Sequence, residues 1–490
     1  MKDNSLQKIT ALGRLTVLGL VMASLAGCAM VGPDYKEPKT VTLGNQYKAA
    51  KGWSLAKPQD AQDKGPWWQV YHDAMLDNLM KQVAINNQNV AQYLAQYQKA
   101  RALAEEAGAD LTPEVSLSLS SSRGRSSRVI SNSHSVEGDV SWEVDLWGKL
   151  RRTREEERAN AQSSAAELAS ATLSAQSELA QDYFELRILD EKIKLYQKNI
   201  EIYQRYLKVV ENQYKLGKET RDALAQARTQ LHGARSSKLD LVWQRAQMEN
   251  AIAVLIGRSA SNFSIKAVDF KYQLPAIPTA IPSQLLQRRP DVAQAERTVA
   301  AANAAVGVAI AGYYPDVTLT ASGGFSSSHW SDLLEWPARM WSIGPSITET
   351  LLDFGRTSAE VRQARASYRA DVASYRQSVL DAIKEVENYL IESHVLTQEL
   401  KEQQQATASA KESAKITYNQ YVAGMIDYLD VATTEATSLS EQQSLLSLQQ
   451  TQLINSVNLI AALGGGWDRS ELVGAKSFDS ASQDAAKSPE

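Results

Sequence analysis

The chain of 490 residues has few of the residues on which several classes of site depend. Cys28 is its only cysteine, which excludes an internal disulfide. Its five histidines lack the spacing of a metal site, and the sequence has neither a glycine-rich phosphate loop nor the Gly-x-Ser-x-Gly turn of a serine hydrolase. We therefore expect no bound metal, no cofactor and no enzyme activity.

Strong charge and long apolar runs are also absent. The net charge is −4, and the sequence has no basic cluster of the kind that binds nucleic acid. After the N-terminal region no run of eighteen apolar residues occurs, so we expect no transmembrane helix in the mature chain. Any membrane crossing would then have to be made by strands.

Glycine and proline are missing from residues 149–214, a stretch rich in Ala, Glu, Gln, Leu and Arg. These residues are good helix formers. Apolar or tyrosine side chains recur at every seventh position from Leu179 to Tyr214, with a second series three positions later. The heptad pattern predicts a coiled-coil helix, which at this length would extend for about 100 Å.

Two halves of the chain carry the same pattern. Gly148 and Gly217 are 69 residues apart, as are Gly355 and Gly424, and the two pairs are offset by 207. The same offset aligns further motifs: Trp147-Gly148 with Phe354-Gly355, Asn212-Gln213-Tyr214 with Asn419-Gln420-Tyr421, and Ile256-Gly257 with Leu463-Gly464. Upstream, Thr112-Pro113 aligns with Tyr314-Pro315 at an offset of 202. The duplication predicts an elongated, pseudo-symmetric molecule rather than a globular enzyme.

Each half is expected to contain a helix, a β-hairpin, a long helix, a turn and a return helix. The halves cover residues 75–257 and 283–466. The expected elements are helices at 75–109 and 283–311, hairpins at 114–147 and 316–352 with loops at 121–135 and 323–331, long helices at 148–215 and 355–422, and return helices at 220–257 and 427–463. A tether (28–74), a proline-containing connector (258–282) and a polar tail (467–490) complete the chain.

The hairpins alternate apolar and polar side chains, which predicts half-buried strands. In the second strand of the first hairpin, one face carries four carboxylates: Glu137, Asp139, Glu143 and Asp145. Such a face must contact water, whereas the opposite face suits lipid, so the carboxylates are expected to line the lumen of a pore. Asp145 could instead cap the long helix that follows it.

Four strands cannot close a membrane barrel. An open strand edge in hydrocarbon leaves backbone groups unpaired, and closed bacterial barrels begin at about eight strands. Several copies must therefore pool their strands. Two copies would give eight strands and three would give twelve, and the residue pattern does not choose between them.

The N-terminus has the form of an export signal over residues 1–27. Lys2, Lys8 and Arg14 provide a basic region, and a short apolar core ends in Leu25-Ala26-Gly27-Cys28. The pattern predicts cleavage before Cys28 and acylation of that cysteine. Several acyl chains together anchor a protein stably to a membrane.

Motifs along nearly the whole mature chain carry a family resemblance. They are Leu25-Ala26-Gly27-Cys28, Gly32-Pro33-Asp34-Tyr35, Trp67-Trp68, Trp142-Glu143-Val144-Asp145-Leu146-Trp147-Gly148, Arg289-Pro290-Asp291-Val292, Ala295-Glu296, Tyr314-Pro315 and Leu352-Asp353-Phe354-Gly355-Arg356. In this order and spacing the chain resembles the TolC-like outer membrane factor family, in its lipoprotein branch.

The resemblance implies a mostly α-helical fold with a membrane β-barrel. A homotrimer would form a twelve-stranded barrel from four strands per chain, on a periplasmic tunnel of long helical hairpins. The implied partners are outer membrane lipids, a periplasmic adaptor and an inner-membrane pump of the RND type, which together expel drugs, dyes or metal ions. An exit duct for type I protein secretion remains an alternative, as does a periplasmic coiled-coil adaptor or structural lipoprotein.

The turns after the two long helices are the candidate gate. The resemblance implies that the turn from Tyr421 to Asp430 lies at the periplasmic tip, where Asp430 matches an aspartate that lines the constriction. Repeated by symmetry, Asp427 and Asp430 would form carboxylate rings that favour cations. The alternative is that both residues serve the start of the return helix, Asp427 as its cap.

The first-half turn offers further gate candidates in Arg221 and Asp222, which follow a capping threonine, Thr220. Gly217 and Gly424 are expected to adopt backbone angles that other residues avoid. The resemblance also implies that these tips contact the adaptor.

Overall fold

The computed structural model of the chain describes residues 30–39, 47–48, 66–126, 129–275 and 289–467. Cys28 and the expected signal lie outside these residues, as do parts of the tether, connector and tail. The described residues form two compact units. Unit 1 holds residues 30–39, 95–126, 129–165 and 294–377, and unit 2 holds residues 47–48, 66–94, 166–275, 289–293 and 378–467.

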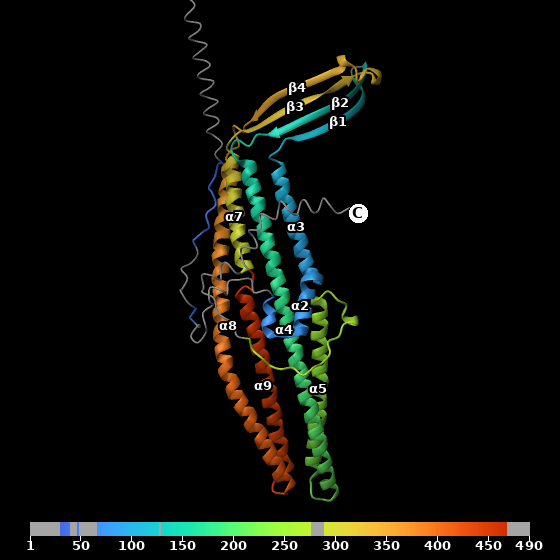
Figure 1. The fold of residues 1–490 in the computed structure, drawn as a ribbon, viewed down its shortest axis with the longest axis vertical. Helices are drawn as coiled ribbons and strands as arrows, with labels where there is room; N and C mark the ends of the chain where they lie inside the picture. The colour runs from blue at the N-terminus through green and yellow to red at the C-terminus, as the bar shows by residue number, and fades with distance from the viewer. Residues whose placement is uncertain (1–29, 40–46, 49–65, 127–128, 276–288, 468–490) are drawn as a thin grey trace, which may run out of the picture. The chain divides into compact units, whose positions relative to one another are not determined.

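Seven α-helices account for most of the described residues (Figure 1). They are α2 (Ala74–Asn86), α3 (Gln88–Ala109), α4 (Lys149–Lys215), α5 (Arg221–Leu255), α7 (Pro290–Ala311), α8 (Arg356–Val422) and α9 (Tyr428–Ala462). The helices α4 and α8 have 67 residues each, and α5 and α9 have 35 each. Within the described part of the chain, none of the helices is both long and apolar enough to span a membrane.

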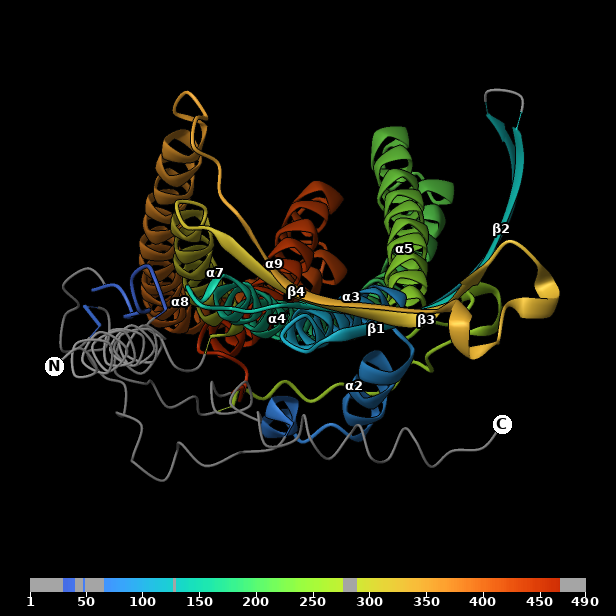
Figure 2. The same cartoon turned by 90° about the horizontal axis from the view of Figure 1, so that it is seen from above.

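Unit 1 contains a four-stranded antiparallel sheet, seen edge-on in Figure 2. Its strands are β1 (Glu114–Ser126), β2 (Val129–Glu143), β3 (Asp316–Ser327) and β4 (Arg339–Thr348), in the order β1-β2-β3-β4. Because β1 and β2 come from the first half of the chain and β3 and β4 from the second, the pairing of β2 with β3 joins the two halves.

The expected bounds of the loops within the hairpins were wrong. Most of residues 121–135 is strand, since β1 continues to Ser126 and β2 begins at Val129. In the second hairpin only the first part of the expected loop at 323–331 is strand, because β3 continues to Ser327, and the residues after it are loop as expected. Serine- and arginine-rich segments have little intrinsic strand preference, so their sequence reads as a loop. The antiparallel ladder, which runs without a gap from Glu114↔Ser141 to Ser126↔Val129, supplies the missing stabilisation.

The single helix expected over residues 75–109 was also wrong, because it is divided at Asn87. Asn87 has extended backbone angles, and its Oδ1 accepts hydrogen bonds from the N–H groups of Asn89 and Val90. Its Nδ2 donates to the carbonyl of Leu255 at 2.8 Å. Asn87 therefore caps α3 and ties the break to the end of α5.

Unit 2 is held by two apolar clusters. In the first, Met80, Leu179, Ile252 and Leu453 bring together α2, α4, α5 and α9, and each is fully buried. The second lies towards the two turns and joins α4, α5, α8 and α9. Burying each such aliphatic side chain contributes roughly 1.5–3 kcal/mol, which gives the amphipathic helices their stability.

Candidate functional site

The sheet of unit 1 separates polar from apolar side chains. Asp139 lies opposite Ser116 and Ser322, and Glu137 lies opposite Ser118 and Gly324. Side chains alternate between the faces of a strand, so these two carboxylates share one face with a row of serines. Glu143 belongs to the same face, and its Oε1 lies 3.5 Å from the Nζ of Lys149.

The opposite face is apolar. One row across all four strands is formed by Val115, Val140, Ala321 and Ile343. Val115 is 75% exposed and Ile343 is 76% exposed. Exposed apolar side chains on one face and carboxylates on the other suit a sheet that separates lipid from water.

Asp145 does not continue the carboxylate face, because β2 ends at Glu143. Its carboxylate oxygens accept hydrogen bonds from the N–H groups of Leu150 and Arg151, each at 3.1 Å, and pair with the Arg151 guanidinium at 2.9 Å. Asp145 thus stabilises the first turn of α4.

The two turns after the long helices have the same backbone geometry. Gly217 has φ 70° and Gly424 has φ 74°, and a side chain at either position would meet open space. The N–H of Lys218 donates to the Gln213 carbonyl, as that of Met425 donates to Gln420, at 2.9 and 3.0 Å. Both turns end their helices through the same left-handed motif, so it is the backbone conformation that requires glycine here.

The return helices begin differently. Thr220 caps α5, with its hydroxyl accepting from the N–H of Ala223 at 3.1 Å. Asp427 holds the equivalent position before α9, but its side chain accepts no capping hydrogen bond. Both Asp427 and Asp430 are exposed, as are Arg221 and Asp222. Capping of α9 by the Asp427 side chain, the alternative considered for this residue, is therefore not seen.

Tyr421 links the two turns. Its side chain is buried, and its hydroxyl oxygen lies 2.6 Å from the Oε1 of Gln213 and 3.0 Å from the Oε1 of Glu219. Burial, together with the hydrogen bond to Glu219, raises the pKa of the tyrosine hydroxyl, which stays protonated and can donate. The contact joins the end of α8 to the end of α4 and the turn that follows it.

A second set of links in the same region was not predicted from the sequence. The hydroxyl of Tyr206 donates to the buried carboxylate of Glu435 at 2.6 Å, joining α4 to α9. Gln230 of α5 donates to the carbonyl of Ala432 at 2.9 Å and accepts from Tyr428 at 3.2 Å. The partners are about 200 residues apart along the chain, and no local pattern marks them.

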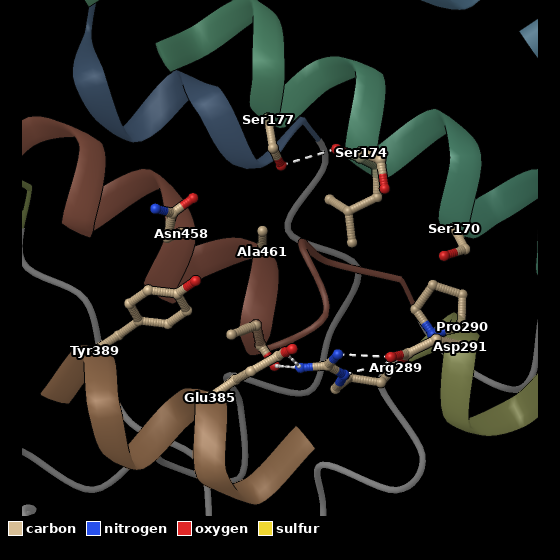
Figure 3. Close-up of a pocket in the computed structure, with 12 residues that line it drawn as sticks. Ser170, Ser174, Ser177, Arg289, Pro290, Asp291, Glu385, Tyr389, Asn458 and Ala461 are labelled. Atoms are coloured by element: carbon tan, nitrogen blue, oxygen red, sulfur yellow. Dashed lines mark hydrogen bonds and ion pairs between the residues drawn. The ribbon is translucent and has the colours of Figure 1, made fainter. Parts of the chain in front are cut away.

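Arg289, a residue of a quoted family motif, lines a polar cavity of about 240 Å³ in unit 2 (Figure 3). The guanidinium pairs with Asp291 at 2.6 Å and with Glu385 of α8 at 2.7 Å, and donates to the carbonyl of Ala462 in α9 at 3.3 Å. These bonds satisfy the buried cation and connect the start of α7 with α8 and α9. Among the residues that the structure describes, no group of three or more His, Cys, Asp or Glu side chains could hold a metal ion.

Comparison with known proteins relates both halves of the chain to one family. The family model described as outer membrane efflux protein matches residues 79–258 and 281–465. The probable outer membrane lipoprotein SilC of Salmonella typhimurium is 27% identical over 447 residues, covering 90% of this chain and 96% of that protein. The probable efflux pump outer membrane protein TtgC of Pseudomonas putida is 27% identical over 472 residues, covering 92% and 96%.

Solved structures agree with the sequence relatives. The outer-membrane channel OprN has a TM-score of 0.83 at 28% identity, covering 90% of this chain and all of that chain. The open-state MtrE outer membrane channel of Neisseria gonorrhoeae has a TM-score of 0.79 at 25% identity, covering 90% and 99%. These matches confirm the resemblance found from the quoted motifs. The chain belongs to the outer membrane efflux protein family.

Proposed function

We propose that the protein is the outer-membrane exit duct of a tripartite efflux system, a passive channel for drugs or other small toxic solutes. The energy would come from an inner-membrane pump, of the RND type, joined to the duct by a periplasmic adaptor. The main observation in support of this proposal is that the family match spans both halves of the chain. Support comes from TtgC, which is named as an efflux pump protein and matches 92% of this chain.

We further propose that three copies assemble in the outer membrane, each anchored through an acylated Cys28. Their strands would form a twelve-stranded barrel, continued in the periplasm by a helical tunnel. The support lies in the sheet, where β1 and β4 are the outer strands and each has one edge without a partner strand among the described residues. Such an edge in lipid costs several kcal/mol per unpaired backbone group.

The internal repeat specifies how two copies would join. Glu114 pairs with Ser141, and Asp316 pairs with Thr348. A residue of β1 therefore corresponds to the β3 residue whose number is 202 higher, and a residue of β2 corresponds to the β4 residue whose number is 207 higher. The observed pair Ser141↔Thr320 between the two halves then becomes Thr348 of one copy opposite Ser118 of the next, because 141 + 207 = 348 and 320 − 202 = 118.

Two further observations support this register. It places residues 340–348 of β4 opposite residues 118–126 of β1, so that each strand is paired up to its C-terminal residue. Ile347 then lies opposite Leu119 on the apolar face, and Thr348 lies opposite Ser118 on the polar face. A shift of one residue would mix the two faces.

Cysteine pairs test the closure directly. Each chain would carry either Ser118→Cys with Thr348→Cys or Leu119→Cys with Ile347→Cys, since adjacent antiparallel pairs alternate between wide and narrow spacing. When membranes that contain either variant are treated with an oxidant, we expect disulfides to join three copies into one covalent ring. This trimer should survive boiling in detergent and separate into single chains only when the disulfides are reduced. The control pair Ser120→Cys with Thr348→Cys is displaced by two residues and should join poorly.

The outcomes separate the alternatives. A covalent ring of two copies would contradict the trimer, and equal joining of the displaced pair would contradict the register. A failure of all pairs to join would contradict the shared barrel and favour a periplasmic adaptor or structural lipoprotein.

In this assembly the polar face of the sheet is the lumen. Glu137, Asp139 and Glu143 would line the pore and favour cations. Asp427 and Asp430 would form the gate at the far end, with Tyr421 holding it closed and with Arg221 and Asp222 on the neighbouring turn. Gly217 and Gly424 shape the two turns that would contact the adaptor. The proposed gate is supported by the exposure of Asp427 and Asp430 and by the contact that Tyr421 makes between the two turns within one chain.

A further inference from the structure

Residues 30–39, termed the strap, form no helix or strand, yet they are held along unit 1 (blue beside α8 in Figure 1). The strap contains the motif Gly32-Pro33-Asp34-Tyr35, to which neither the pore nor the gate gives a role. Its contacts reach α4 and α7 along most of its length and α8 at its end.

Arg152 of α4 is the main anchor of the strap. Its side chain is only 2% exposed, and its guanidinium pairs with Asp34 at 2.8 Å and with Glu155 at 2.7 Å. It also donates to the carbonyl of Val31 at 3.2 Å. A buried guanidinium without such partners is costly, so the strap supplies acceptors that α4 alone does not provide.

Two glycines allow the strap to approach α7 closely. A Cβ atom at Gly32 would lie 2.6 Å from the Cα of Gly307, and Gly32 has φ 89°. A Cβ atom at Gly307 would lie 3.0 Å from the side chain of Arg152. Asn303 adds a hydrogen bond from its Nδ2 to the carbonyl of Pro33 at 2.9 Å. At this point the strap and α7 approach so closely that neither has room for a side chain, which is why both positions are glycine.

Tyr35 fills the next position along α7. Its hydroxyl donates to Glu296, its ring packs near Ala159, Ala300 and Ala301, and the guanidinium of Arg297 lies 5.6 Å from the ring centroid. Further on, the Tyr375 hydroxyl donates to Glu37 at 3.3 Å, and Arg376 donates to the carbonyl of Lys39, also at 3.3 Å.

The first residues of the strap cover the junction between the sheet and α4. The N–H of Val31 donates to the carbonyl of Trp147 at 2.9 Å, and a Cβ atom at Gly148 would lie 2.8 Å from the Cα of Met30. In the described part of the chain nothing covers the equivalent junction of the second half, where a Cβ atom at Gly355 would meet no atom within 4 Å. The strap is therefore a feature of one junction and not of the repeated fold.

We propose that the strap is a built-in ligand that positions the N-terminus of the protein. Its seating on α4 and α7 orders the junction of β2 with α4 and clamps the first half of the chain to the second. Because Cys28 precedes Met30 by two residues, seating of the strap would limit how far the proposed acylation site can lie from this junction. Only the statement about the acylation site rests on the proposed function, since seating of the strap and clamping of the two halves require neither the lipid nor the barrel.

Limited proteolysis of the full chain tests the proposal. Trypsin cleaves after Lys36, which lies within the strap, and cleavage requires local opening. We expect Gly32→Ala to accelerate cleavage after Lys36 at least about tenfold, because the added methyl group collides with α7. Gly307→Ala should act in the same direction by displacing Arg152. The matched control is Gly233→Ala in α5, where a Cβ atom meets nothing within 4 Å, and cleavage should be unchanged.

Hydrogen exchange of the segment 144–152 is the second measurement. If the strap orders the junction, Gly32→Ala speeds exchange there, although Gly32 lies outside all helices and strands. The proposal is overturned if cleavage after Lys36 is equally fast in the parent chain and the Gly32→Ala variant, or if exchange at the junction is unchanged when the strap is released. Incorporation of a labelled fatty acid at Cys28 reports separately on the proposed lipidation.

Discussion

Gly424 illustrates how one residue ends a 67-residue helix. Its φ of 74° lies in the left-handed region, and the space around it is open, so only the backbone angle restricts the position. An L-residue there costs roughly 1–2 kcal/mol. The same argument applies to Gly217 at φ 70°.

We expect Gly424→Ala to loosen the second turn without disturbing the rest of the helix pair. Amide exchange over residues 420–426 should accelerate about fivefold or more, as follows from a cost of about 1 kcal/mol in local stability. Gly233→Ala within α5 serves as control, since alanine favours a helix. Unchanged exchange in the turn would show that the angle is not limiting.

At the scale of single elements, the long helix α4 carries a carboxyl group, that of Asp182, whose pKa is raised by its surroundings. Asp182 lies between Glu178 and Glu185 on successive turns of the helix. Partial burial, and then repulsion from these two carboxylates, raise the pKa of Asp182 to about 7. The carboxyl group is thus neutral in the folded chain at pH values where it is ionised in the unfolded chain.

The sign of the resulting pH dependence follows from proton binding. Between about pH 4 and pH 7 the folded state holds a proton that the unfolded state has lost, so this group's contribution to stability falls as pH rises. Replacing Asp182 by Asn removes the penalty. The gain in thermal midpoint of Asp182→Asn over the parent should therefore be larger at pH 7.5 than at pH 4.5. Equal gains at both pH values would contradict the assignment.

The strands and helices also show where local patterns are insufficient. The serine-rich ends of β1 and β2 lack an apolar pattern, and their strand structure depends on the pairing that continues to Ser126↔Val129. The break at Asn87 has a local sign, because asparagine is a good capping residue. The bond from Asn87 to Leu255, which ties the break to α5, has none.

For the whole assembled channel, we expect the double variant Asp427→Ala and Asp430→Ala to conduct more and to select cations less. The proposed rings would lose charge at the narrowest point, and the chain would keep the Tyr421 contacts. Single-channel recording in planar bilayers measures both quantities. Glu412→Ala, an exposed carboxylate of α8 away from the turn, is the control. Unchanged conductance and reversal potential would leave these aspartates with a role only at the helix start.

What the sequence alone determined was mainly local or repeated. The heptad pattern and the absence of glycine and proline predicted the long helices, and Gly217 and Gly424 marked their ends, because helix propensity and turn geometry depend on near neighbours. The offset of 207 revealed the duplication, and alternation in the hairpins identified the two faces of the sheet. The quoted motifs indicated the family that the comparisons confirm.

Tertiary structure decided what depends on residues far apart in the chain. The Tyr421 hydroxyl meets Gln213 across 208 positions, Glu435 meets Tyr206 across 229, and Arg152 meets Asp34 across 118. Each is an ordinary polar residue in its own segment, and it acquires a function only when folding removes water and brings one partner within hydrogen-bond distance. Side-chain periodicity carries no information about such pairs, whereas the packed helices and the strap define them in space.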